Sequence, residues 1–154
     1  MPKQDTLDRA RRDKREGKAP STQAGEFVRE EMDHIREGKH GARSAKQAIA
    51  IGLSKARRAG VKLPPPKSGQ AGEGTRKQAA RDLRRASKSK SPAISTKRSR
   101  AAIQALKKEG RSAASHQALA THAKQAARKR SPTARSDQAK RAARTRRSTS
   151  RRPK

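Results

Sequence analysis

The stretch SAKQAIAIGLSKARRAG, residues 44–60, holds the densest group of branched aliphatic side chains in this chain and contains no acidic residue. Ser44 followed by Gln47 is the capping-box pattern that begins a helix, and Gly60 is the residue type expected just past a helix end. The pattern therefore predicts a helix between these residues. Glycine inside a helix costs about 1 kcal/mol relative to alanine, so Gly52 indicates that another backbone approaches closely there.

The residues before this helix predict a second amphipathic helix that packs on it. Apolar side chains recur at helical spacing over 22–37, and Gly38 follows as a stop signal. Together the two helices predict a helical hairpin over 21–63. It buries few large side chains, so we expect it to be marginally stable and to gain stability through self-association or a partner. Its packing residues are predicted to be Phe27, Val28, Met32, Ile35, Ile49, Gly52 and Leu53.

The other flank of the 22–37 helix is acidic, because Glu26, Glu30, Asp33 and Glu37 share one stripe at 100° per residue. A stripe of this kind is usually a solvated face or an internal partner for basic groups, here Lys46, Lys55 and the basic tail. A binding site is the alternative.

Composition limits the fold to a small core. The chain has 154 residues, with 43 Lys and Arg against 13 Asp and Glu, a net charge of +30, 29% hydrophobic and 1% aromatic residues. Low hydrophobicity with high net charge is typical of partial disorder, because little apolar surface can offset the entropy of ordering. The predicted fold class is all-α: a small N-terminal helical hairpin followed by extended or partly disordered, basic, alanine-rich helices.

Punctuation by proline and glycine predicts four segments along the chain. Residues 1–20 are expected to form a short polar helix and a linker, ahead of the hairpin. Three prolines open a Pro/Gly linker over 64–74. A cationic tail follows over 75–154. Its helical segments are predicted at about 75–86, 96–109, 112–130 and 132–147.

The charge is unevenly distributed. Residues 1–40 carry 10 basic and 9 acidic side chains, 41–66 carry 6 and 0, and 67–154 carry 27 and 4, so the three parts have net charges of +1, +6 and +23. A strongly cationic region favours a polyanion, and nucleic acid is the abundant intracellular one. The predicted phosphate-contacting residues are Arg81, Arg84, Arg85, Arg98, Arg100, Lys107, Lys108, Arg111, Lys124, Arg128, Lys129, Arg130, Lys140, Arg141, Arg144, Arg146 and Arg147.

Other chemistry is not indicated. The sequence has no cysteine, no apolar run long enough for a signal peptide or a membrane span, and no glycine-rich phosphate loop. His34 and His40 are six residues apart, as are His116 and His122, which would place each pair on different sides of a helix; we interpret all four as solvated. We expect a cytoplasmic protein that is not an enzyme, with no cofactor, metal, membrane or small-molecule substrate.

The string EGKHGARSAKQAIAIGLSKARRAG, residues 37–60, resembles a family of small, very basic bacterial proteins of unknown function that share a run close to KQAIAI(G/A)LSxAR. The resemblance implies a bacterial or phage source and brings no catalytic residues. The tail resembles that of linker histones, with lysine, arginine, alanine and serine interspersed.

The sequence therefore predicts sequence-nonspecific nucleic-acid binding by a histone-like, nucleoid-associated protein, with duplex DNA favoured over RNA. Two alternatives stay open. One is a ligand of the ribosome or of structured RNA, because an A-form duplex presents the same phosphates. The other is a regulatory protein whose hairpin binds a protein partner.

Overall fold

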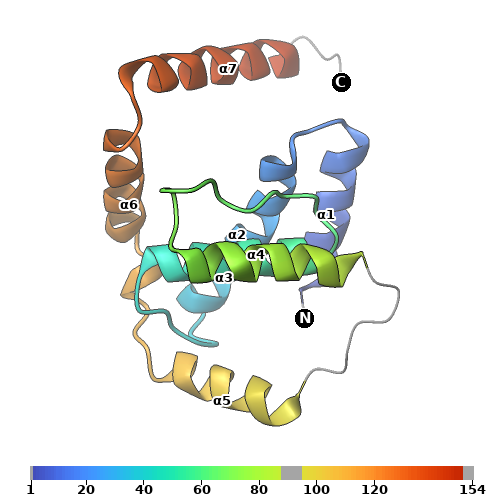
Figure 1. Ribbon diagram of the computed structural model, residues 1–154, viewed down its shortest axis with the longest axis vertical. Coiled ribbons are helices and arrows are strands. Elements are labelled where there is room, and N and C mark those ends of the chain that lie inside the picture. The colour runs from blue at the N-terminus through green and yellow to red at the C-terminus, as the bar shows by residue number, and fades with distance from the viewer. Residues whose placement is uncertain (1, 88–94, 151–154) are drawn as a thin grey trace. The chain divides into compact units, whose positions relative to one another are not determined.

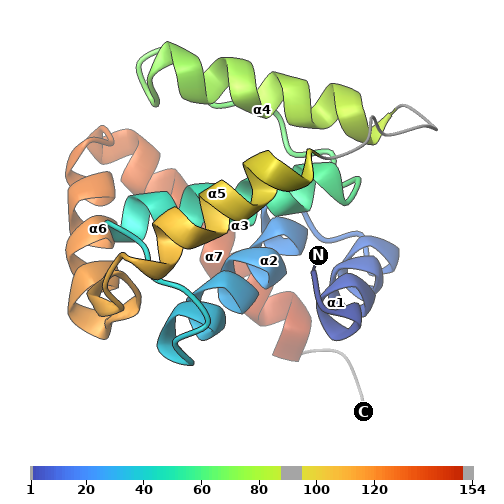
Figure 2. The ribbon, with the colours of Figure 1, turned by 90° about the horizontal axis from the view of Figure 1, so that it is seen from below.

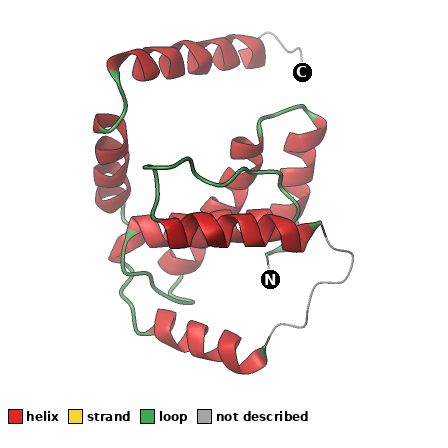
Figure 3. Ribbon diagram, in the orientation of Figure 1, coloured by secondary structure: helices red, strands yellow, loops and turns green. Residues whose placement is uncertain are grey.

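The computed structural model describes residues 2–87 and 95–150, and within them every regular element is helical (Figure 3). This confirms the all-α prediction. Residues 88–94 and 151–154 of the predicted tail lie outside the described residues. The elements are α1 (Gln4–Arg15), α2 (Pro20–Arg36), α3 (Ala45–Arg58), α4 (Glu73–Ala86), α5 (Thr96–Lys107), the 3-10 turn η1 (Ser112–Ala114), α6 (His116–Arg128) and α7 (Pro132–Ser150) (Figure 1).

The chain divides into two compact units, Met1–Ala118 and Leu119–Lys154. The first contains α1 to α5, η1 and the start of α6. The second contains the rest of α6 and α7. Packing between helices is described below for the first unit, which holds all of the buried side chains among the described residues.

Helices α2 and α3 pack against each other, and α3 begins where its sequence predicts. The Ser44 hydroxyl oxygen accepts a hydrogen bond from the Gln47 backbone N–H at 3.2 Å, and the helix ends before Gly60, which has a φ of 93°. At the contact with α2, a Cβ added to Gly52 would lie 2.7 Å from Val28 Cα. The two backbones therefore touch at this glycine.

Helix α1 differs from the expected polar segment ahead of the hairpin, because it packs on α2 (Figure 2). Thr6 and Ala10, one helical turn apart, are buried, and Ala10 joins a core cluster with Phe27 of α2 and Ala56 of α3. Small side chains allow this contact although the helix has few apolar residues. Sequence periodicity missed the packing face because large apolar side chains do not define it.

Helix α4 packs on α3 and is not part of a free tail. Ala79 and Asp82 are its buried residues, and the Asp82 carboxylate accepts hydrogen bonds from the Ser54 hydroxyl at 2.6 Å and from the Gln78 side-chain amide at 3.0 Å. The helix begins at Glu73, two residues before the predicted start. The hairpin is thus one part of a four-helix packing, with α1 on one side and α4 on the other.

The start of the predicted 64–74 linker is tied to the bundle. The Arg57 guanidinium donates to the carbonyl oxygens of Leu63 at 3.1 Å and of Pro64 at 3.2 Å. The chain that leaves α3 is therefore held against it for several residues before α4 begins.

Most side chains of α5, α6 and the described part of α7 are exposed. Neither α5 nor α6 has a buried residue, and both are shorter than predicted because Gly110 and η1 separate them. Pro132 occupies the first position of α7, and the Ser131 hydroxyl oxygen accepts from the Ala134 N–H at 3.2 Å, as a serine cap followed by proline predicts. Partial disorder of this region stays a prediction.

The turn between α2 and α3 docks on the chain that follows α5. The Gly41 N–H donates to the Leu106 carbonyl at 2.9 Å, and the Ala42 N–H donates to the Gly110 carbonyl at 3.1 Å. A Cβ on Gly41 would lie 1.9 Å from the Glu109 carbonyl oxygen, so only glycine fits there. This contact holds the α2–α3 turn in place.

Candidate functional site

The first candidate site is the set of seventeen predicted phosphate-contacting side chains, here called the basic surface, all of which are exposed. They occur on four helices and the turns beside them: Arg81, Arg84 and Arg85 on α4; Arg98, Arg100 and Lys107 on α5, then Lys108 and Arg111; Lys124 and Arg128 on α6, then Lys129 and Arg130; and Lys140, Arg141, Arg144, Arg146 and Arg147 on α7.

Acidic residues of the same region have partners outside the basic surface. Glu73 pairs with Lys77 at 2.6 Å, and Glu109 pairs with Arg43 at 3.4 Å. Asp82 is 1% exposed and is engaged by neutral side chains of the bundle. The fourth acidic residue, Asp137, lies exposed on α7. Three of the four carboxylates of this region are therefore engaged by groups outside the basic surface.

The N-terminal bundle neutralises its own charge. Arg9 of α1 pairs with Glu26 of α2 at 2.5 Å, and Lys18 pairs with Asp13 at 2.7 Å. Within the acidic stripe, Glu26 is thus paired with α1, whereas Asp33 and Glu37 pair with the exposed neighbours Arg36 and Lys39. The expected partners were Lys46, Lys55 and the tail. The division into a near-neutral head and a cationic tail is a property of the folded chain.

Within a single helix, the basic side chains align. Lys140, Arg144 and Arg147 are spaced i, i+4, i+7 on α7, which places them on one stripe. Because α4 turns Ala79 and Asp82 towards α3, Arg81, Arg84 and Arg85 remain available to solvent. Each of these helices can thus present several guanidinium and ammonium groups at once.

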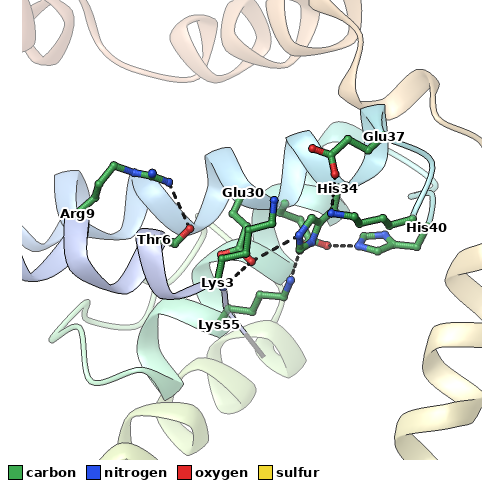
Figure 4. Close-up of polar contacts among 10 residues, drawn as sticks. Lys3, Thr6, Arg9, Glu30, His34, Glu37, His40 and Lys55 are labelled. Carbon is green, nitrogen blue, oxygen red and sulfur yellow. Dashed lines mark hydrogen bonds and ion pairs between the residues drawn. The ribbon is translucent and has the colours of Figure 1, made fainter.

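The second candidate site is a group of ionisable side chains inside the bundle, here called the buried polar cluster: Glu30, Glu31, His34, His40 and Lys55. Glu30 is 3% exposed and Glu31 is fully buried. Helix α2 supplies both glutamates and His34, the turn after it supplies His40, and α3 supplies Lys55, so three segments converge at this point (Figure 4).

Each carboxylate of the cluster is engaged at one oxygen. Glu31 Oε2 accepts from Lys55 Nζ at 2.5 Å, while Glu31 Oε1 lies 3.4 Å from His40 Nε2. Glu30 Oε1 accepts from the Lys3 backbone N–H at 3.0 Å and lies 3.6 Å from His34 Nε2. Among the described residues, Glu30 Oε2 and Glu31 Oε1 have no hydrogen-bond partner, although both are buried.

The positions of His34 and His40 correct the sequence interpretation. A separation of six residues puts two side chains on different sides of a helix only if the helix continues, and α2 ends at Arg36. Gly38, with a φ of 75°, then reverses the chain and brings the two imidazole rings to a centroid distance of 6.0 Å. The predicted stop signal at Gly38 was the clue that the helical spacing did not apply to His40.

The environment of His34 favours its neutral form. Burial lowers the pKa of this imidazole, and the positive charge of Lys55 lowers it further, while the carboxylate of Glu30 acts in the opposite direction. This environment therefore disfavours the protonated, charged ring. His116 is exposed and His122 is half-exposed, both on α6.

The predicted hairpin-packing residues lie within the bundle. Phe27, Met32, Ile35 and Gly52 are buried, and Val28, Ile49 and Leu53 are half-buried. These residues lie where α2 and α3 pack against each other, and none of them belongs to the buried polar cluster.

Comparison with known proteins gives one match. A family of unknown function (DUF6496) matches residues 3–67, which include α1, α2, α3 and the whole buried polar cluster. Helices α4 to α7 lie outside the matched segment. No curated protein and no solved structure matches the chain.

Proposed function

We propose that this protein binds nucleic acid without sequence specificity, through contacts between the basic surface and phosphate groups. The observation that carries the proposal is the charge distribution of the folded chain: seventeen exposed basic side chains on α4 to α7, whose neighbouring acidic residues are mostly engaged elsewhere. Neutralising phosphates releases condensed counterions, which is the main source of affinity in binding of this kind.

The side chains available favour phosphate contact over base recognition. Residues 67–154 contain no aromatic residue, so no stacking platform for single strands is present there. Alanine, serine and glutamine separate the basic residues on these helices. Contacts of this composition position a protein on the backbone and carry little sequence information.

Duplex DNA is the proposed partner, in a histone-like role at the nucleoid. The major groove of B-form DNA is wide enough for an α-helix, whereas the major groove of A-form RNA is deep and narrow. Helices without a buried residue among their described positions, such as α5 and α7, fit the former better. None of the helices in the described part of the chain combines the length and hydropathy required to cross a membrane.

Binding is also proposed to order the tail. Helices of 12 to 19 residues without buried side chains are marginal in water, and like charges along them are destabilising. Duplex DNA would remove that repulsion. The helical circular dichroism signal of the full chain should therefore rise when duplex DNA is added.

The test compares two triple variants that lose the same charge. Lys140→Gln/Arg144→Gln/Arg146→Gln changes α7, and Arg11→Gln/Arg12→Gln/Arg15→Gln changes exposed residues of α1. Loss of three phosphate contacts should reduce the slope of log affinity against log salt by about 2.7, since each contact contributes about 0.9. The α7 variant is expected to show this reduction and the α1 variant to keep the wild-type slope.

Equal effects of the two variants would contradict the proposal, because they would show a response to net charge alone. The same titrations with duplex RNA separate the partners. Tighter binding to RNA at matched salt would replace the DNA assignment with structured-RNA binding.

A further inference from the structure

We propose that Glu31, His34 and His40 form a binding site for a divalent transition-metal ion, with Zn²⁺ the best match. One ligand atom from each residue lies within 4.8 Å of the others. Glu31 and His34 are at i, i+3 on α2, so they share a face, and the turn at Gly38 brings His40 to them. The inference does not depend on nucleic-acid binding.

The buried polar cluster holds more carboxylates than ammonium groups. Glu30 and Glu31 contribute two buried carboxylates, while Lys55 contributes one ammonium group, whose side chain is 18% exposed. Burying an uncompensated charge costs free energy. Basic residues are abundant in this chain of net charge +30, yet Lys55 is the one lysine or arginine of the cluster. A cation bound beside the two carboxylates would compensate the one that Lys55 does not contact.

The unpartnered carboxylate oxygen is aimed at the proposed site. Lys55 occupies Oε2 of Glu31, which leaves the fully buried Oε1 without a hydrogen-bond partner among the described residues. His40 Nε2 of the cluster lies 3.4 Å from it. An oxygen and a nitrogen in this arrangement are suited to share a cation.

The second ring nitrogen of His40 supports coordination through Nε2. His40 Nδ1 lies 3.1 Å from the Gly41 carbonyl oxygen. A carbonyl accepts only, so this contact is a hydrogen bond when Nδ1 carries the proton, and the neutral ring then presents the lone pair of Nε2 to Glu31. Histidines that bind metals typically donate their other N–H to a carbonyl in this way.

The donor set selects the type of ion. Two imidazoles and one carboxylate are a known set for Zn²⁺ with one position left for water, whereas Ca²⁺ and Mg²⁺ prefer oxygen ligands alone. Bonds of about 2.0–2.2 Å in a tetrahedral site place donor atoms about 3.3 Å apart. The Glu31–His40 distance of 3.4 Å already meets this, and the His34 donor, which lies within 4.8 Å of the other two, would move inward by up to about 1.5 Å.

Coordination would join the α2–α3 turn to α2. His40 adjoins Gly41, whose N–H is bonded to the Leu106 carbonyl, so an ion at this site would also fix the docking of the turn on the chain after α5. The ion is therefore expected to raise the thermal midpoint of the first unit, because a ligand that binds the folded state alone stabilises it.

The experiment uses the full chain, freed of metal with a chelator, and Zn²⁺ as the probe. Wild type should bind one equivalent by calorimetry and show a higher thermal midpoint. His34→Gln/His40→Gln should lose more than about 100-fold in affinity, since loss of outer partners alone typically costs 10–100-fold. His116→Gln/His122→Gln removes the same number of histidines from α6 and should bind as wild type does.

Absence of saturable Zn²⁺ binding by wild type would overturn the proposal, as would unchanged affinity in the His34/His40 variant. If that double variant does not fold, Co²⁺ titration of wild type replaces it as the test. Tetrahedral coordination gives intense visible bands and supports the site, whereas the weak spectrum of hydrated Co²⁺ contradicts it.

Discussion

At the scale of single residues, Gly52 shows how one position decides a helix contact. The sequence presents it as an unfavourable residue inside the most apolar helix, and the structure places the backbone of Val28 against it. Gly25, inside α2, is a useful contrast, because a Cβ added there would meet nothing within 4 Å. Glycine thus permits a close backbone contact at position 52, whereas no atom comes near the equivalent point at position 25.

Gly52→Ala should lower the free energy of unfolding. Alanine adds about 1 kcal/mol of helix propensity, but its Cβ would lie 2.7 Å from Val28 Cα, so the helices must separate, and overpacking typically costs about 1–3 kcal/mol. Gly52→Leu should destabilise more. Gly25→Ala is the matched control and should stabilise by about 0.5–1 kcal/mol. Thermal melts decide, and a higher midpoint for both Gly52 variants would show that the helices do not touch there.

What residue-level patterns reveal depends on whether the signal is local. The Ser44 cap, the Gly38 and Gly60 stops and the small contact at Gly52 could be predicted, because each follows from backbone requirements of nearby residues. The approach of His40 to Glu31 could not, because it needs the path of the turn. Glu31 and His34 share a helix face in the sequence, and only the approach of His40 to them was hidden.

At the scale of elements, small side chains explain what the sequence misassigned. Helices α1 and α4 are polar by composition, yet both pack on the bundle through alanine and buried, hydrogen-bonded polar groups. A periodicity of large apolar residues does not reveal such faces. Element type and most boundaries could be predicted for the described helices. Composition alone, however, assigns α4 to the tail, because the helix is polar.

The docking of α4 depends on Asp82. Asp82→Ala would leave the Ser54 hydroxyl and the Gln78 amide without their acceptor, at a cost of about 1–3 kcal/mol. The thermal midpoint should fall, and trypsin should cleave faster at Arg81 and Arg84. Asp137→Ala removes an equal charge from an exposed position of α7 and should change the midpoint little. Equal melting of the two variants would show that α4 does not pack on α3.

At the scale of the whole chain, charge is the organising feature. The first 40 residues carry 10 basic and 9 acidic side chains, and the folded bundle pairs some of them with one another, as in Arg9–Glu26 and Lys18–Asp13. Most of the net charge of +30 comes from the region of α4 to α7, where the basic side chains are exposed. Composition alone predicted this asymmetry, because charge needs no knowledge of packing; the buried polar cluster needed the fold.

The central claim is that this charge binds phosphates, and the salt dependence of duplex affinity tests it most directly. Contact with 6 to 10 phosphates predicts that the affinity of the full chain for a DNA duplex of mixed sequence falls by about 10³ to 10⁵ between 50 and 200 mM salt. The loss should be the same for duplexes of unrelated sequence. An affinity that changes less than about 10-fold over this range would contradict the account.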